Sequence, residues 1–215
     1  MITFVEGSGK TRAAVAAITF EAIVDLHRTP GFLFDMNHFF QRLLSRFLHE
    51  NLTGHTIKDE YATSTIFGYA PDANPRWRSL PKPRPDFALF QAKKLTGFLD
   101  AKYRDIWEKG FPAKWPYQLS IYALASPNRA SILLYGTMCA EARDERIQIH
   151  QPVSWSTKDS AFVILRPVPL QRLAELLDPA QSNRQAIERS AFANELVVFE
   201  TNKLNCQGRD VLNRR

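Results

Sequence analysis

The feature that most constrains this chain is a pair of short acidic motifs about a dozen residues apart. The first is Arg84-Pro85-Asp86-Phe87, and the second is Asp100-Ala101-Lys102-Tyr103. Side chains alternate between the faces of a strand, so Asp100 and Lys102 point the same way. Aspartate is disfavoured in strand interiors, and here it interrupts an apolar run. We predict a β-hairpin of strands 86–90 and 95–104, with Asp86 across from Asp100.

These three side chains carry the groups that phosphodiester hydrolysis requires. Two carboxylates can hold a divalent metal that activates water and relieves charge on the phosphate. Mg²⁺ prefers hard oxygen ligands and few protein carboxylates. A nearby lysine such as Lys102 can stabilise developing negative charge. The alternative is a surface Asp–Lys pair beside an unrelated turn aspartate, and these three residues do not decide between the two readings.

Two neighbouring features favour the metal site. Gln118 and Tyr122 are four residues apart, so they share one face of the helix predicted directly after the hairpin. Between Arg76 and Lys114 the chain has ten Lys or Arg residues against four Asp or Glu, with Trp77 and Trp107 interleaved and Trp115 directly after. Basic residues with aromatics suit a nucleic-acid backbone. The DNA-contacting candidates in this region are Arg84, Arg104 and Lys114.

The remaining pattern predicts a mixed α/β fold. Helices are expected at 12–28, from an Asp35 N-cap through Leu48, and at 116–125, 169–177 and 182–199. Further strands are expected at 57–68, 131–138, 145–151 and 161–166. We expect a lead-in helix in residues 1–30, one domain over 31–200 and a mobile basic tail at 201–215.

The composition indicates which kinds of partner and which cellular compartment to expect. The chain has 215 residues, a net charge of +6 and a pI of about 9.4, which makes a polyanionic partner plausible. Only two cysteines are present, Cys139 and Cys206, and they form no CxxC pair. No signal peptide or apolar run of membrane-spanning length is evident. We expect a cytoplasmic protein without a membrane partner.

Other chemistry-bearing patterns are weaker. Gly7-Ser8-Gly9-Lys10-Thr11 resembles the end of a P-loop, but Phe4 stands where the first glycine belongs. The histidines show no zinc-binding spacing. No serine lies in a G-x-S-x-G context. Nucleotide binding, zinc binding and serine hydrolysis are therefore not supported.

The order Pro-Asp, Asp-x-Lys and Gln-x-x-x-Tyr resembles the PD-(D/E)xK nuclease superfamily in its RecB-like branch. Within it, the segment Phe32-Leu33-Phe34-Asp35-Met36-Asn37-His38-Phe39-Phe40 resembles the stretch that precedes the nuclease core in McrC, the endonuclease subunit of McrBC restriction systems. Together the motifs cover roughly residues 12–140.

This resemblance implies a restriction-endonuclease-like αβββαβ core with N-terminal helices and a C-terminal α/β extension. It implies that Asp86, Asp100 and the Ala101 carbonyl ligate Mg²⁺, or alternatively Mn²⁺. Lys102 would be the catalytic lysine, and Gln118 and Tyr122 would support the site and touch DNA. The implied activity is Mg²⁺-dependent DNA endonuclease, and the implied partner is an McrB-like AAA+ GTPase.

The chain also departs from the family pattern. McrC proteins usually carry a β-rich region that docks onto the GTPase, and residues 1–30 stand in its place. Many relatives have an acidic residue on the first core helix where this sequence has Gln41, and Glu50 is poorly positioned to replace it. Two alternatives therefore stay open: an inactive DNA-binding or assembly subunit with the nuclease fold, and a solitary RecB-like exonuclease.

Overall fold

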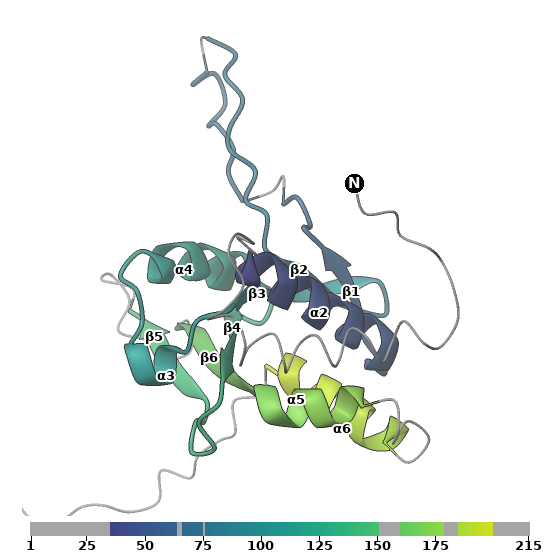
Figure 1. The fold of residues 1–215 in the computed structure, drawn as a ribbon. Coiled ribbons are helices and arrows are strands. Elements are labelled where there is room, and N and C mark those ends of the chain that lie inside the picture. The colour runs from purple at the N-terminus through teal and green to yellow at the C-terminus, as the bar shows by residue number, and fades with distance from the viewer. Residues whose placement is uncertain (1–34, 64–65, 75, 151–159, 179–184, 200–215) are drawn as a thin grey trace, which may run out of the picture.

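A six-stranded mixed sheet organises the protein (Figure 1). The structure is a computed structural model that describes residues 35–63, 66–74, 76–150, 160–178 and 185–199. The strands lie in the order β1 (Thr56–Asp59), β2 (Phe87–Gln91), β3 (Lys94–Lys102), β4 (Ala130–Thr137), β6 (Ala161–Pro169) and β5 (Glu145–Ile149). β1, β2 and β3 form antiparallel pairs, whereas β3, β4 and β6 run parallel. β5 is antiparallel to β6 at the far edge.

Helices cover both faces of this sheet. The helices are α2 (Met36–Asn51), α3 (Ile106–Lys109), α4 (Trp115–Ala125), α5 (Leu170–Leu177) and α6 (Ala186–Val197). Side chains of α2, α5 and α6 form one buried cluster with one face of the sheet. Side chains of α3 and α4 form a second cluster with the other face. The order α2, β1, β2, β3, α4, β4 confirms the predicted αβββαβ core.

Helix α2 begins where the sequence predicts. The Asp35 carboxylate accepts hydrogen bonds from the backbone N–H groups of Asn37 and His38, at 3.0 and 3.1 Å. An N-cap of this kind satisfies donors that the first helical turn leaves without partners. The predicted apolar stripe is confirmed, and its fully buried members are Phe40, Leu44, Phe47 and Leu48.

The predicted hairpin is also confirmed. Ala92 and Lys93 form its two-residue turn with φ angles of 47° and 67°. Two consecutive positive φ angles match the twist of antiparallel strands. Phe87 pairs with Leu99 and Ala88 with Phe98, so Asp86 comes opposite Asp100 as the ladder ends.

The predicted strand at 57–68 was too long. β1 ends at Asp59, and Glu60 takes a left-handed conformation with φ of 45°. A bulky residue rarely adopts this conformation, and it turns the chain out of the sheet. The chain then leaves the body as a long projection before it returns to β2, as Figure 1 shows.

Three further differences concern element boundaries. The sequence analysis missed the short helix α3, although Asp105 caps it by accepting from the Glu108 N–H at 3.2 Å. β6 runs on to Pro169, past the predicted end at residue 166. Its antiparallel neighbour β5 pairs no further than Leu165, so Pro167 lies beyond that ladder, where proline is tolerated. α6 is shorter than the predicted 182–199 helix.

The middle of β3 is packed against the end of the described chain. Gly97 is buried, and a Cβ added there would overlap the Phe199 ring. Phe199 follows α6 and packs against the α2-side cluster. Glycine is therefore required at position 97 by close approach and not by backbone conformation.

Several predictions fall outside the described residues. These are the helix at 12–28, the Gly7–Thr11 segment, Phe32 to Phe34 and the basic tail. Within the part of the chain that is described, no helix is both long enough and apolar enough to cross a membrane.

Candidate active site

The structure brings Asp86 and the Asp100-Ala101-Lys102 segment together at the end of the hairpin. Asp86 immediately precedes β2, and its Oδ2 accepts a hydrogen bond of 2.8 Å from the Ala101 N–H. The sheet ladder therefore continues through the Asp86 side chain where the two backbones separate. This contact fixes the carboxylate against the strand that carries the second acidic motif.

Asp100 is a buried charge on the α4 side of the sheet. It is 3% exposed, and Phe98 on the same face packs into the cluster formed with α4. Leu99 and Ala101 point into the opposite cluster, as the alternation predicts. The reading of Asp100 and Lys102 as a surface pair is therefore wrong, because helices cover both faces.

Lys102 places one cation among three oxygen atoms. Its Nζ lies 2.6 Å from Asp100 Oδ2, 3.2 Å from the Ala101 carbonyl oxygen and 3.6 Å from Asp86 Oδ2. These are the three groups that the family resemblance implies as metal ligands. The oxygens thus converge on a single position that a cation can occupy.

The electrostatics of the cluster follow from burial and from the two close carboxylates. The pKa of Asp100 is raised to about 6, because burial and the Asp86 carboxylate both raise it and together outweigh the opposing effect of Lys102. Burial lowers the pKa of Lys102, but the attraction of Asp100 and Asp86 outweighs it, and the net pKa is raised. The site therefore favours a bound positive charge.

The donor set fits a hard divalent cation. Carboxylate and carbonyl oxygens are the ligands that Mg²⁺ prefers, with water completing its coordination. Within the described residues, no third carboxylate, histidine or cysteine joins this pair as a metal-binding group. Such a site would leave several coordination positions to water or substrate.

Gln118 and Tyr122 lie next to this cluster on α4. The Gln118 amide donates a hydrogen bond of 3.0 Å to the Tyr122 hydroxyl, so the predicted shared helix face is confirmed. The Tyr122 ring is buried beside Phe98, with 5.9 Å between ring centroids. Burial raises the Tyr122 pKa, Gln118 opposes this, and the charges on Asp100 and Asp86 raise it further.

A cavity of about 480 Å³ joins α4 to the chain just before Asp86. Arg84 and Lys114, two of the predicted DNA-contacting residues, line it together with Gln118 and Tyr122. Arg104 does not line it and is exposed after β3. The sequence analysis did not select Tyr117, which also lines the cavity with its side chain 75% exposed. The sequence signal that could have identified Tyr117 is an aromatic residue directly before Gln118.

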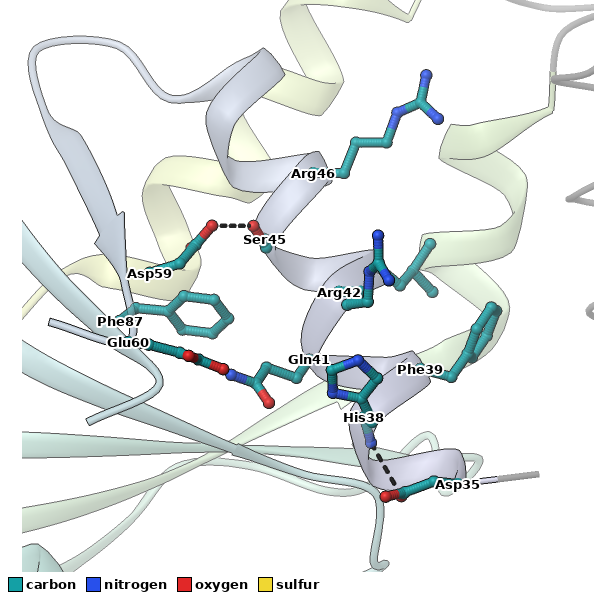
Figure 2. Close-up of a pocket in the computed structure, with 11 residues that line it drawn as sticks. Asp35, His38, Phe39, Gln41, Arg42, Ser45, Arg46, Asp59, Glu60 and Phe87 are labelled. Atoms are coloured by element: carbon teal, nitrogen blue, oxygen red, sulfur yellow. Dashed lines mark hydrogen bonds between the residues drawn. The ribbon is translucent and has the colours of Figure 1, made fainter. Parts of the chain in front are cut away.

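Gln41, at the expected acidic position of the first core helix, lies elsewhere. It lines a groove of about 840 Å³ between α2 and the β1 end, and Figure 2 shows its side chain directed toward Glu60. Glu50 forms an exposed ion pair with Arg46 at 2.9 Å.

Comparison with known proteins matches the chain to a family model and to a solved structure. The sequence model of the McrBC 5-methylcytosine restriction system component matches residues 16–136. A chain of the Thermococcus gammatolerans assembly of McrB AAA+ hexamers with bound McrC superposes with a TM-score of 0.51 and 16% identity. The match covers 78% of this chain but 34% of that one, so this chain spans about a third of its length. No curated protein matches significantly.

Proposed function

Because the chain belongs to the McrBC 5-methylcytosine restriction system component family, we propose that it is the nuclease component and hydrolyses DNA phosphodiester bonds with Mg²⁺. The observation that carries the proposal is the convergence of Asp86, Asp100 and the Ala101 carbonyl on one cation position. Restriction-system membership alone does not distinguish a nuclease from its partner subunits.

Each side chain of the cluster has a role in this proposal. Asp86, Asp100 and the Ala101 carbonyl would hold the metal ion, which supplies an activated water and charge relief on the phosphate. Lys102 Nζ lies within 3.6 Å of both carboxylates, so a bound metal ion would displace the ammonium to a neighbouring position, where a phosphate oxygen could accept from it. Beside a phosphate oxygen the ammonium would stabilise the negative charge that develops as the bond breaks.

Tyr122 and Gln118 would act on the substrate side. Both residues line the cavity that Arg84 and Lys114 share, and the Gln118 amide donates to the Tyr122 hydroxyl. Two cationic side chains at the mouth of this cavity attract the DNA backbone, and the hydroxyl and amide position it by hydrogen bonds. Arg104, exposed after β3, adds to the same positive charge.

The family setting supports a partner for this activity. In the Thermococcus gammatolerans assembly McrC is bound to McrB AAA+ hexamers. We extend this to the present chain and propose that an McrB-like AAA+ GTPase delivers its DNA. Because this chain spans about a third of the matched chain, the docking region of that protein need not lie in the shared part.

A second candidate is a subunit that binds DNA without cutting it. Gln41 favours this reading, because it stands where many relatives carry an acidic residue, and it lines the groove between α2 and the end of β1. The converging oxygens at Lys102 favour catalysis instead.

A plasmid-cleavage assay separates the two candidates. The full chain is incubated with supercoiled plasmid in Mg²⁺, Mn²⁺ or EDTA, with and without a candidate McrB-like GTPase and GTP. We expect nicking or linearisation that requires a divalent cation and is lost in Asp100→Ala and Lys102→Ala. Retained DNA binding without cleavage in every condition would establish the non-catalytic subunit. A requirement for free ends on linear DNA would identify an exonuclease.

Control variants make the result specific to the site. Lys94→Ala removes an exposed lysine from the other end of β3, and Glu175→Ala removes an exposed carboxylate from α5. Both should cleave as the wild type does. Cleavage that survives Asp100→Ala and Lys102→Ala would show that the activity resides elsewhere.

A further inference from the structure

The segment between β1 and β2 forms an arm that projects from the body of the protein (Figure 1). Its two legs are joined at the base, where the Thr63 N–H and hydroxyl both donate to the Pro83 carbonyl, at 3.1 and 2.8 Å. The Glu60 N–H donates to the Asp86 carbonyl at 3.0 Å. Tyr61 packs edge-on against Phe90 of β2, with 5.5 Å between ring centroids. The base of the arm is therefore fixed to the strand that follows Asp86.

The far end of the arm is a turn organised by one side chain. The Asn74 carboxamide accepts from the Arg78 N–H and donates to the Arg78 carbonyl, both at 2.9 Å. The Asn74 carbonyl accepts from the Trp77 N–H at 3.1 Å. Trp77 has a left-handed φ of 52° and is 91% exposed. The turn thus holds an indole in an unfavourable conformation away from any core of the described chain.

The arm is also strongly cationic. From Ile66 to Pro85 it contains four basic residues and a single acidic residue, Asp72. The basic side chains are exposed, and within the described chain none forms an ion pair; they are Arg76, Arg78, Lys82 and Arg84. Unpaired guanidinium groups on both sides of an exposed aromatic ring suit a polyanion with stackable or groove-lining surfaces.

The arm begins at the candidate active site. Pro83 and Arg84 at its base line the cavity that also contains Gln118 and Tyr122. Trp77 lies nine positions before Asp86, so one extended leg reaches at most about 30 Å from the carboxylates. At about 3.4 Å per base pair this corresponds to roughly nine base pairs of duplex.

We propose that this arm is a duplex-DNA clamp whose tip, Arg76-Trp77-Arg78, grips the substrate up to about one helical turn from the cleaved phosphate. The proposal rests on the proposed nuclease function. Arg76 and Arg78 contact phosphates on either side of a groove, and the Trp77 indole enters the minor groove between them, as apolar wedges do in other DNA-binding proteins. An exposed aromatic also occurs at protein–protein interfaces, but the charge along the whole arm favours DNA.

The test measures DNA binding without cleavage. Fluorescence anisotropy of a labelled 30-base-pair duplex is recorded in EDTA over a range of salt concentrations, a duplex length of about three helical turns. We expect Arg76→Ala/Arg78→Ala to weaken binding at least tenfold and to lower the salt slope by about 2, since each lost phosphate contact contributes about 0.9. Trp77→Ala should weaken binding several-fold with an unchanged slope, and Trp77→Phe should recover most of that loss.

The control removes the same charge elsewhere. Lys94→Ala/Arg143→Ala takes two exposed cations from the start of β3 and from the loop before β5, and it should bind as the wild type does. Circular dichroism and thermal unfolding check that each variant is folded. Hydroxyl-radical footprinting should show protection within about nine base pairs of the cut position in the wild type and its loss in the double variant.

Each outcome separates the clamp from the nuclease function. If the arm variants bind DNA as the wild type does, the clamp proposal is overturned, even when cleavage is normal. If they bind DNA normally but no longer co-elute with an McrB-like GTPase, the arm is a protein-docking surface and the proposal is likewise overturned. If the arm variants lose DNA affinity while the wild type never cleaves, the clamp stands and the nuclease function fails.

Discussion

The ammonium of Lys102 lies 2.6 Å from the buried carboxylate of Asp100, two residues earlier on the same strand. This ion pair places a charge of the protein's own at the position where the proposed metal ion would bind. Asp86 and the Ala101 carbonyl complete the set of oxygens around that charge. Metal binding therefore requires Lys102 to give up contacts with the carboxylates, and the balance between the two cations can be measured.

We expect Lys102→Met to destabilise the protein by about 3 kcal/mol in EDTA, because two neighbouring carboxylates lose their counter-charge. Saturating Mn²⁺ should restore more stability to this variant than it adds to the wild type, since no ammonium has to be displaced. Urea unfolding with and without Mn²⁺ measures both effects. Lys94→Met, at the exposed end of β3, should change neither value. An equal Mn²⁺ effect in wild type and Lys102→Met would argue against a shared cation position.

The pH dependence of stability should report Asp100. Its pKa is raised from the ordinary 3.8 to about 6, so the folded state holds this proton more tightly than the unfolded state does. The stabilisation of the folded state that comes from this raised pKa is thus fully present below pH 4, and it is lost as the pH rises to about 6. Asp100→Asn should gain about 2–3 kcal/mol relative to wild type across this window. Urea unfolding between pH 4 and pH 7 provides the comparison, and a constant difference would contradict the assignment.

Metal affinity should follow the same proton. A metal ion binds the ionised form of Asp100, so below pH 6 it must displace a proton. The apparent dissociation constant of the metal ion should therefore rise about tenfold for each unit that the pH falls. Above pH 6 the affinity should level off. Titration calorimetry with Mn²⁺ from pH 5 to pH 7.5 tests this directly. Affinity that is flat through pH 6 would show that Asp100 is not a ligand.

Tyr122→Phe should distinguish the role of the hydroxyl in cleavage from the role of the ring in packing. The ring and its contact with Phe98 are retained, and only the hydroxyl that accepts from Gln118 is lost. We expect less than about 1 kcal/mol loss of stability and a 10- to 100-fold lower kcat. Single-turnover plasmid cleavage and urea unfolding measure the two quantities. A large stability loss with unchanged cleavage would reduce Tyr122 to a packing role.

Gly97→Ala should destabilise the protein by about 1–3 kcal/mol, because the new methyl group meets the Phe199 ring. Phe199→Leu alone removes part of a buried contact. In the double variant with Gly97→Ala, it also removes the ring with which the new methyl group would clash. The two effects should therefore be non-additive, with the double variant more stable than the sum predicts. Additive losses in a double-mutant cycle would show that the two residues do not touch.

Local pattern was enough to predict the site hairpin. Alternation between the faces of β3, the polar Gln91–Lys94 turn and the proline before Asp86 each depend only on nearby residues. The N-cap at Asp35 and the Gln118–Tyr122 pair were predictable for the same reason, because capping and helix periodicity act over a few positions. The structure confirms the placement of these elements.

Features that depend on distant packing were not predictable. Whether Asp100 faces water or a helix depends on where α4 lies, and the sequence of β3 carries no information on that. The strand at 57–68 looked continuous because its β-branched residues fit a sheet, but its partner β2 begins only at Phe87. The arm exists because the described residues between Asp59 and Phe87 have no strand to pair with in the sheet. Gln41 looked like a replaced ligand, and its groove shows it directed toward Glu60 instead.

The packing of Phe199 against Gly97 has a consequence for the order of events during synthesis. β3 carries Asp100 and Lys102, yet its central residue is covered by a side chain about one hundred positions later in the sequence. A ribosome must translate past residue 199 before this contact can form. We expect a nascent chain to keep β3 incompletely packed until then, so that the cluster of Asp86, Asp100 and Lys102 reaches its final packing late in synthesis.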